Sequence, residues 1–185
     1  RDILCKKMAL SFFTPNMDAT LWEQLRPLCT DFCNAPYYCT LICQLNLNDA
    51  SENTLENAYD QIRNQFINHN IAFLSVEKKP GTFVIHIGDA RLHPSTYHDM
   101  LNFLYTEIRC ILADPAEIYF AVGNVVQTPD QLYYSYINAV INLRNLFFLG
   151  YNNICFSQNT ETAVHQTFES NRTSCITDSA FFQKY

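Results

Sequence analysis

The middle of the chain contains two amphipathic helical patterns separated by a β-hairpin pattern, an order that few folds accommodate. The first helical pattern covers about residues 52–70, with apolar residues on one stripe. The second covers about 94–113, and its Pro94 suits the first position of a helix. Between them, Pro80-Gly81 predicts a tight turn joining two strands. The residues that carry the three patterns are Leu55, Tyr59, Ile62 and Phe66; Tyr97, Leu101, Leu104 and Ile108; and Phe83, Ile85 and Ile87.

Apolar strand patterns at 36–47 and 117–124 enclose this central part. The resulting order, β-α-β-β-α-β, is the split βαβ or ferredoxin-like arrangement. A third helix and a short strand at 153–158 follow it, which makes the sheet about five-stranded. We therefore expect an α/β (α+β) fold with a mixed sheet and helices mainly on one face.

Two further helices are predicted at the N-terminus, from Asp2 to Phe13 and from Ala19 to Cys33, with Asp18 as a cap. The helix after the central part has the clearest start signal. In "TPDQ", Thr128 is a candidate cap and Gln131 the residue that reaches back to it. Its apolar stripe is Leu132, Tyr136, Ala139, Val140, Leu143 and Phe147, and Gly150 is its expected end.

Composition excludes several classes of function. The formal net charge is −6, and the 12 Lys and Arg are scattered. Nucleic-acid binding needs a basic cluster, so this segment is not expected to contact DNA or RNA. No apolar run reaches the ~20 residues of a membrane-spanning helix, and no secretory signal is recognisable. The chain begins at Arg1 and resembles a module of a longer, cytoplasmic protein.

Eight cysteines raise the question of a metal site. Cys29 and Cys33 form one C-x3-C pair, and Cys39 and Cys43 form another. Zinc sites more often use C-x2-C turns, and these pairs fall in a predicted helix and a predicted strand among apolar residues. We expect buried thiols, with zinc and then disulfides as the alternatives.

The order of elements and the segment "SYINAVINLRNLFFLGYNNICF" resemble the GGDEF domain, the palm-like fold of diguanylate cyclases. The resemblance is greatest to the degenerate GGDEF-like middle domain of AraC-type regulators, many of which are two-component response regulators. Matching positions are Ser135, Tyr136, Ala139, Leu143, Arg144, Phe147, Phe148, Leu149 and Gly150, which also have a purely structural interpretation as a buried helix stripe and its cap. The implied organisation is N-terminal connecting helices at 1–35, a degenerate domain at 36–157, and an extension or linker at 158–185.

A working cyclase needs acidic residues that hold divalent cations and a glycine-rich hairpin that approaches the nucleotide. Aligning Phe83 with the family's Phe places Lys79, Pro80, Gly81 and Thr82 over Gly-Gly-Asp-Glu, so both acids are missing. On the first strand, Gln44 and Asn46 stand where a carboxylate is expected. Asp49 and Asp89, nearby in sequence, are better explained as turn or cap residues. The resemblance thus implies no catalytic residues, no metal, no cofactor and no enzymatic activity.

Two functions remain. The first is a non-catalytic module that couples an input domain to a C-terminal helix-turn-helix domain, the only part expected to bind DNA, with a homodimer as a further expectation. The second is a small-molecule or nucleotide sensor that keeps the cyclase cleft without its metals. A residual enzyme is a third alternative, which would need catalytic acids from outside the expected positions.

Overall fold

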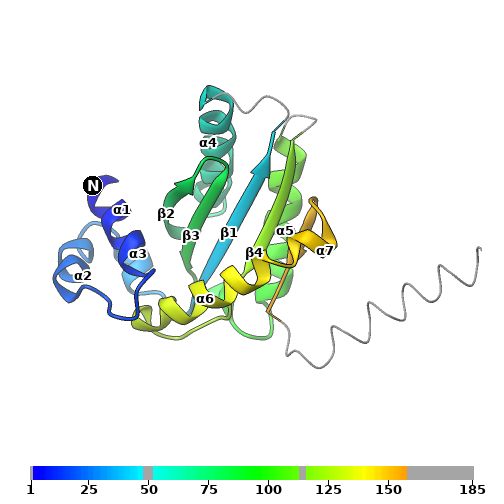
Figure 1. The fold of residues 1–185 in the computed structure, drawn as a ribbon. Coiled ribbons are helices and arrows are strands. Elements are labelled where there is room, and N and C mark those ends of the chain that lie inside the picture. The colour runs from blue at the N-terminus through cyan, green and yellow to red at the C-terminus, as the bar shows by residue number, and fades with distance from the viewer. Residues whose placement is uncertain (1, 48–51, 113–115, 158–185) are drawn as a thin grey trace, which may run out of the picture.

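The computed structural model describes residues 2–47, 52–112 and 116–157, so the tail at 158–185 and Asp49 lie outside the described residues. From the first strand onward, the long helices and the strands follow one another in the predicted order (Figure 1). The helices are α1 Asp2–Ser11, α2 Ala19–Leu25, α3 Thr30–Cys33, α4 Glu52–Asn68, α5 Tyr97–Ile111, α6 Leu132–Leu143 and α7 Leu146–Leu149, with 3-10 turns η1 Ala90–Leu92 and η2 Pro129–Gln131. The strands are β1 Tyr38–Asn46, β2 Ala72–Lys79, β3 Thr82–Gly88, β4 Glu117–Val122 and β5 Asn153–Cys155.

The five strands form one mixed sheet in the order β2-β3-β1-β4-β5. The first four are antiparallel to their neighbours, as in a split βαβ sheet, and β5 runs parallel to β4. The parallel pair is possible because α6 and α7 carry the chain back across the sheet before β5. The predicted fold class is therefore confirmed.

Both faces of the sheet are covered. The two longest helices, α4 and α5, pack on one face through Ile62, Phe66 and Leu104. The opposite face is covered by α1, α2, α3 and α6, and Met8 of α1 and Phe12 just after it are fully buried there. Figure 1 shows α4 and α5 behind the sheet and α6 in front of it. The long helices thus lie on one face, as expected. The shorter helices cover the other face, and the residues of β3 and nearly all of those of β4 are buried on both sides of the sheet.

The helix predicted from Ala19 to Cys33 is divided into α2 and α3. Its start is as expected, since the Asp18 carboxylate accepts hydrogen bonds from the amides of Thr20 and Leu21. Pro27 follows the end of α2, and proline has no amide proton and clashes with the preceding turn. The prediction of one continuous helix was therefore wrong.

Two other helix starts differ from the prediction. The α5 helix begins at Tyr97 rather than at Pro94, which lies in a turn closed by hydrogen bonds to the His93 carbonyl. Before α6, Pro129 takes the first position of a 3-10 turn, but the Thr128 side chain makes no capping bond. The Gln131 amide donates instead to the Thr128 carbonyl at 3.1 Å, so the predicted capping box is replaced by a tighter backbone turn.

Candidate functional site

The positions that the sequence comparison matched to a cyclase site meet where the β2–β3 hairpin turns beside the end of β1. Gln44 of β1 lies opposite Thr82 of β3, and the Thr82 hydroxyl donates to Gln44 Oε1 at 2.6 Å. The Gly81 carbonyl accepts the Leu45 amide at 2.8 Å. Neither side chain is a carboxylate, the group that binds a divalent cation most strongly, and one lone pair of Gln44 Oε1 is already used.

Glycine is required at the turn itself. Gly81 has φ of 76°, in the left-handed region, and an added Cβ would lie 3.0 Å from the Leu45 carbonyl oxygen. Lys79 and Pro80 precede it on the exposed side of the turn, where the pairing of β2 and β3 is irregular between Glu77 and Lys79. The Pro80-Gly81 turn is therefore confirmed as a structural feature of the hairpin.

Asn46, the other amide of β1, has a different partner. Its side chain donates to Glu117 Oε2 of β4 at 2.7 Å, at the exposed end of the sheet. Within the described ranges, no three His, Cys, Asp or Glu side chains are placed so that they could hold a metal ion. Likewise, no helix of the described ranges is both long and apolar enough to cross a membrane.

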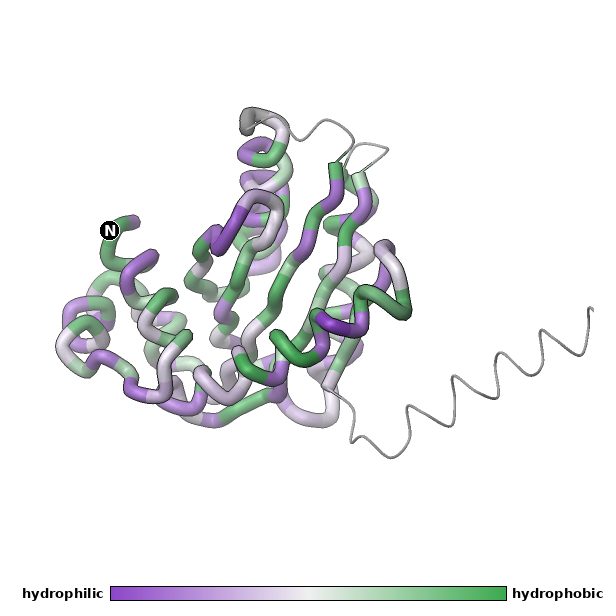
Figure 2. Tube along the Cα trace, in the orientation of Figure 1, coloured by the Kyte–Doolittle hydropathy of each residue, from purple (hydrophilic) through white to green (hydrophobic). Residues whose placement is uncertain are grey.

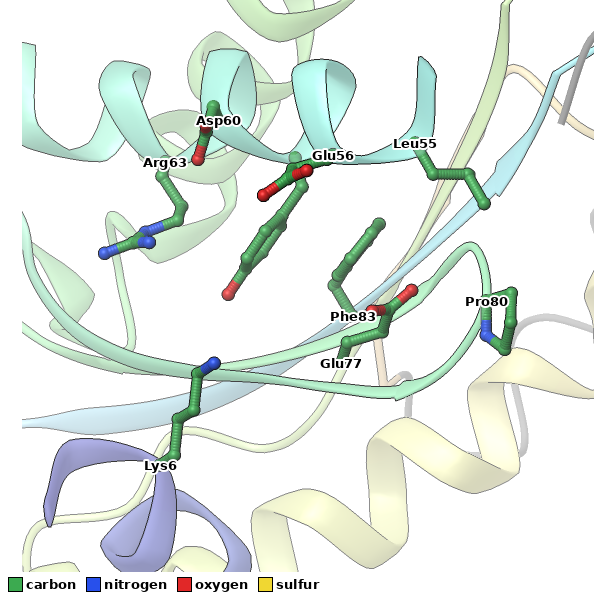
Figure 3. Close-up of a pocket in the computed structure, with 9 residues that line it drawn as sticks. Lys6, Leu55, Glu56, Asp60, Arg63, Glu77, Pro80 and Phe83 are labelled. Atoms are coloured by element: carbon green, nitrogen blue, oxygen red, sulfur yellow. The ribbon is translucent and has the colours of Figure 1, made fainter. Parts of the chain in front are cut away.

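A groove of about 510 Å³ adjoins the hairpin, between α4, the β2–β3 hairpin and α1 (Figure 3). Its centre is Tyr59, whose ring stacks on Phe83 at 4.2 Å between centroids and whose hydroxyl donates to Ser75. Burial raises the pKa of the Tyr59 phenol, so this hydroxyl stays protonated and serves as a donor. Of the predicted site positions, Pro80 and Phe83 line this groove.

The charges around the groove are mixed. Lys6 and Arg63 contribute the cations, and Arg63 Nε is buried with no hydrogen-bond partner among the described residues. The acids are Glu56, Asp60 and Glu77. A second groove of about 400 Å³ shares Lys6, Tyr59 and Arg63 and continues along the edge strand β2. Sequence patterns did not reveal this groove, because its residues come from three elements distant in the sequence.

The two cysteine pairs lie on opposite faces of the sheet. Cys39 and Cys43 are buried on the face covered by α4 and α5, whereas Cys29 and Cys33 pack on the other face. The layer that packs on a sheet lies about 10 Å from it, and Cys39 and Cys43 point away from the layer that contains Cys29 and Cys33. The four sulfurs therefore cannot share one zinc ion. Burial raises the pKa of the Cys39 thiol to about 12 and that of Cys33 to about 11, which disfavours the reactive thiolate.

Three of the family-like residues on α6 form its buried side. Tyr136 and Ala139 belong to the core under the sheet. Ser135 Oγ accepts the Thr40 amide at 2.8 Å and donates to the Asn124 carbonyl at 2.6 Å. Gly123 permits this close approach, because a Cβ there would lie 1.9 Å from the Ser135 carbonyl oxygen. The predicted burial of Tyr136 and Ala139 is confirmed.

The prediction of burial is wrong for Phe147. Its side chain is 88% exposed and that of Phe148 is 81% exposed, whereas Leu143 is half-buried. The chain tightens at Arg144 and Asn145, where amides bind carbonyls three residues back. A 3-10 turn rotates about 20° more per residue than an α-helix, which moves Phe147 off the buried stripe. Gly150, with φ of 72°, ends α7 as predicted.

His86 forms a buried link that the sequence pattern did not indicate. Its Nε2 lies 3.1 Å from the Ala9 carbonyl of α1, which can only accept, so Nε2 carries the proton. Nδ1 therefore accepts from the Thr40 hydroxyl at 2.9 Å. Burial lowers the His86 pKa to about 3, so the ring is neutral at physiological pH.

A scan against protein-family models finds no matching family, and a search of curated proteins finds no match either. The resemblance to a degenerate GGDEF domain therefore stays a prediction from the sequence. Functional arguments rest on the geometry of the hairpin end, the groove and the two sides of α6.

Proposed function

We propose that this chain is a non-catalytic regulatory module of a bacterial AraC-type regulator, acting in the cytoplasm between an input domain and a helix-turn-helix domain. The observation that carries the proposal is a chain of contacts from α1 to α6 through the centre of the sheet. These helices lie near opposite ends of the described sequence, so a displacement of one has a physical route to the other.

The first part of this route is a row of buried hydrogen bonds. The Ala9 carbonyl of α1 binds His86 of β3, and His86 binds the Thr40 hydroxyl of β1. The Thr40 amide then binds Ser135 Oγ of α6. Each of these groups loses a hydrogen-bond partner if its neighbour moves away, and an unpaired buried polar group costs about 1–3 kcal/mol. The row therefore favours joint movement over independent movement.

The second part is aromatic. Phe13, just after α1, stacks on Tyr136 of α6 with ring centroids 4.4 Å apart. Lys78 of β2 donates to the Tyr136 hydroxyl at 2.6 Å, and its ammonium lies over the Phe13 and Tyr136 rings. This junction joins α1, the hairpin and α6 at one point of the surface.

The hairpin end supports the non-catalytic half of the proposal. Gln44 and Thr82 bind each other where a cyclase would present carboxylates, and Asn46 binds Glu117. A triphosphate needs divalent cations to offset its charge, and neutral amides are weak ligands for them. We expect no cyclic dinucleotide from GTP with Mg²⁺ or Mn²⁺, and product formation that Gln44→Ala abolishes would refute this half.

Hydrogen exchange tests the coupling half. Phe13→Ala removes the stack on Tyr136, so amides of α6 should exchange about tenfold faster, equivalent to ~1.4 kcal/mol of lost protection. Phe103→Ala, on an exposed position of α5, is the matched control and should leave α6 unchanged. Faster exchange confined to α1 in the Phe13 variant would sink the coupling proposal.

The groove favours a second candidate function, a small-molecule or nucleotide sensor. Its aromatic floor at Tyr59 and Phe83 and its cations Lys6 and Arg63 suit a flat ring bearing an anionic group. A ligand at a hundred times its dissociation constant adds about 2.7 kcal/mol of stability, which a thermal melt detects. A nucleotide panel with and without Mg²⁺ would therefore show one stabilising ligand, lost in Arg63→Ala and kept in Arg109→Ala. A flat panel would exclude this second function.

A further inference from the structure

The outer side of α6 and α7 carries a hydrophobic surface, here called the outer α6–α7 surface. Half of the exposed large hydrophobic side chains in the described ranges lie on it. It consists of Tyr134, Ile137, Ile141, Phe147, Phe148 and Leu149. Two adjacent phenylalanines exposed by more than four-fifths are unusual, because such patches on soluble proteins mark interaction sites.

These residues form one continuous ridge. Tyr134, Ile137 and Ile141 recur at intervals of three and four, which places them on one side of α6. Arg144 and Asn145 keep helical dihedrals, so α7 continues α6 with only a tightened turn. The Phe147 and Phe148 rings lie 5.2 Å apart, edge to face, at the end of the ridge. Figure 2 shows hydrophobic residues along α7 at the surface of the fold.

The size of this ridge matches a protein interface. Taking ~200 Å² for a full aromatic side chain, its three aromatic residues expose about 450 Å². The aliphatic residues bring the total to roughly 650 Å². A standard interface buries ~800 Å² on each partner, whereas the largest patch of a typical monomer is ~300–600 Å². A polar rim would supply the remainder.

Charge selects the kind of partner. The segment from Leu132 to Gly150 contains one charged side chain, Arg144. A charged partner would find no complementary group on this ridge. A membrane-binding helix would need several Lys or Arg along its polar side, and α6 has none. A second copy of this chain needs neither, because an uncharged ridge is complementary to itself.

The geometry points to a homodimer in which two outer α6–α7 surfaces pack against each other across a two-fold axis. Each chain carries a formal net charge of −6, so two copies repel. The nearly uncharged ridge keeps most of those charges away from the contact. In this dimer, Phe147 and Phe148 of each copy pack against the outer α6–α7 surface of the other copy. Arg144 lies at the rim of the contact. This inference rests on the surface alone and holds whether or not the proposed function is right.

Sedimentation equilibrium is the first test. We expect the wild-type chain to sediment as a dimer and the double variant Phe147→Asp/Phe148→Asp to have a dissociation constant at least about 100-fold higher. Phe103→Asp introduces the same charge at an exposed phenylalanine of α5 and should still dimerise. Thermal melts of the dilute variants establish that all three proteins fold. A monomeric wild type, or a double variant that dimerises as well as wild type, would overturn the inference.

Photo-crosslinking identifies what covers the surface. A chain with Phe148→p-benzoylphenylalanine is mixed with a second batch labelled with ¹⁵N, and the crosslinked peptides are analysed by mass spectrometry. Crosslinks between light and heavy chains that map to α6–α7 would support the homodimer. Crosslinks within one chain to residues 158–185 would overturn it in favour of the chain's own C-terminal segment. Recruitment of the monomer to phosphatidylcholine vesicles would overturn it in favour of a membrane.

Discussion

The hairpin end and the outer α6–α7 surface differ in whether their side chains have partners within the fold. At the hairpin end, Gln44 binds Thr82 and Asn46 binds Glu117. On the outer α6–α7 surface, Phe147 and Phe148 contact each other and little else among the described residues. In the sequence, the first region occupies the positions matched to a cyclase site, and the second belongs to the segment in which the family resemblance is greatest.

Hydrogen bonding and exposure therefore distinguish two regions that the sequence resemblance treats alike. A polar group with a partner gains little from a new ligand, because binding must first break the existing hydrogen bond. An exposed apolar side chain gains from any partner that removes it from water, by about 25 cal/mol per Å². Function is therefore expected at the surface of α6 and α7 rather than at the hairpin end.

The largest expected effect concerns the contact between α6 and the sheet. Gly123→Ala places a Cβ 1.9 Å from the Ser135 carbonyl oxygen, so α6 must move away from the sheet. The packing between α6 and the sheet is then lost. We expect a loss of at least about 5 kcal/mol in the free energy of unfolding, measured by urea denaturation.

Gly150→Ala is the matched control, because a Cβ there meets nothing within 4 Å. It should cost less than Gly123→Ala, about 1–3 kcal/mol, because its φ of 72° and ψ of 176° lie in a region that only glycine adopts readily. Equal costs for the two variants would mean that α6 is not held as closely as the structure shows.

The next effect concerns His86, which lies on the hairpin strand β3 and reaches α6 through Thr40. The folded pKa of about 3 lies below the unfolded value near 6.5, so only the unfolded chain binds this proton between those pH values. The contribution of the neutral His86 ring to the free energy of unfolding is fully present above about pH 6.5. It falls by about 4 kcal/mol as the pH drops toward 3.

The difference in stability between wild type and His86→Gln isolates this proton, since other acids titrate equally in both. Denaturant curves at a series of pH values should show that difference shrinking as the pH falls. A difference that is constant with pH would mean that the histidine is not buried as a neutral ring.

A smaller loss of stability is expected when the hydrogen-bonded pairs at the hairpin end are broken, and it should be larger for the half-buried pair than for the exposed pair. Thr82→Val leaves Gln44 Oε1 without its donor in a half-buried position, and we expect a loss of about 1–2 kcal/mol. The double variant Gln44→Leu/Thr82→Val should recover most of it, because both polar partners are then absent. Asn46→Ala, at the exposed pair, should cost at most ~0.5 kcal/mol. A double-mutant cycle with no coupling between positions 44 and 82 would contradict the observed pair.

The smallest effect is expected on the outer α6–α7 surface. Phe148→Ser should change the stability of the dilute monomer by less than ~0.5 kcal/mol, since the side chain is already 81% exposed. At high protein concentration the wild type should become more stable than the variant, because dimerisation is linked to folding. Melting temperatures across protein concentration measure this. A large loss in the dilute monomer would show that the phenylalanine is part of the core.

Much of the fold was predictable from local patterns. The strand and helix types, their order and the Pro80-Gly81 turn depend on the spacing of apolar residues and on backbone preferences, which act within a few residues. The two wrong helix boundaries, at Pro27 and Pro94, also have a local cause. Proline can stand at any of several positions just before or just after a helix, so it does not fix the exact boundary. The candidate site was predicted less well. The sequence indicated its positions, such as Gln44 and Asn46, but not which side chains they bind.

The sequence by itself determined an α+β order of helices and strands and a hairpin whose turn, Lys79 to Thr82, contains no acidic residue. Only the tertiary structure decided that His86 joins α1 to the sheet and that the two cysteine pairs face opposite sides. It also decided that Phe147 points to solvent rather than into the core. The reason is physical. Secondary structure follows from the period of apolar residues along the chain, whereas burial depends on which elements meet in space, and a rotation of a few tens of degrees at one turn reverses it.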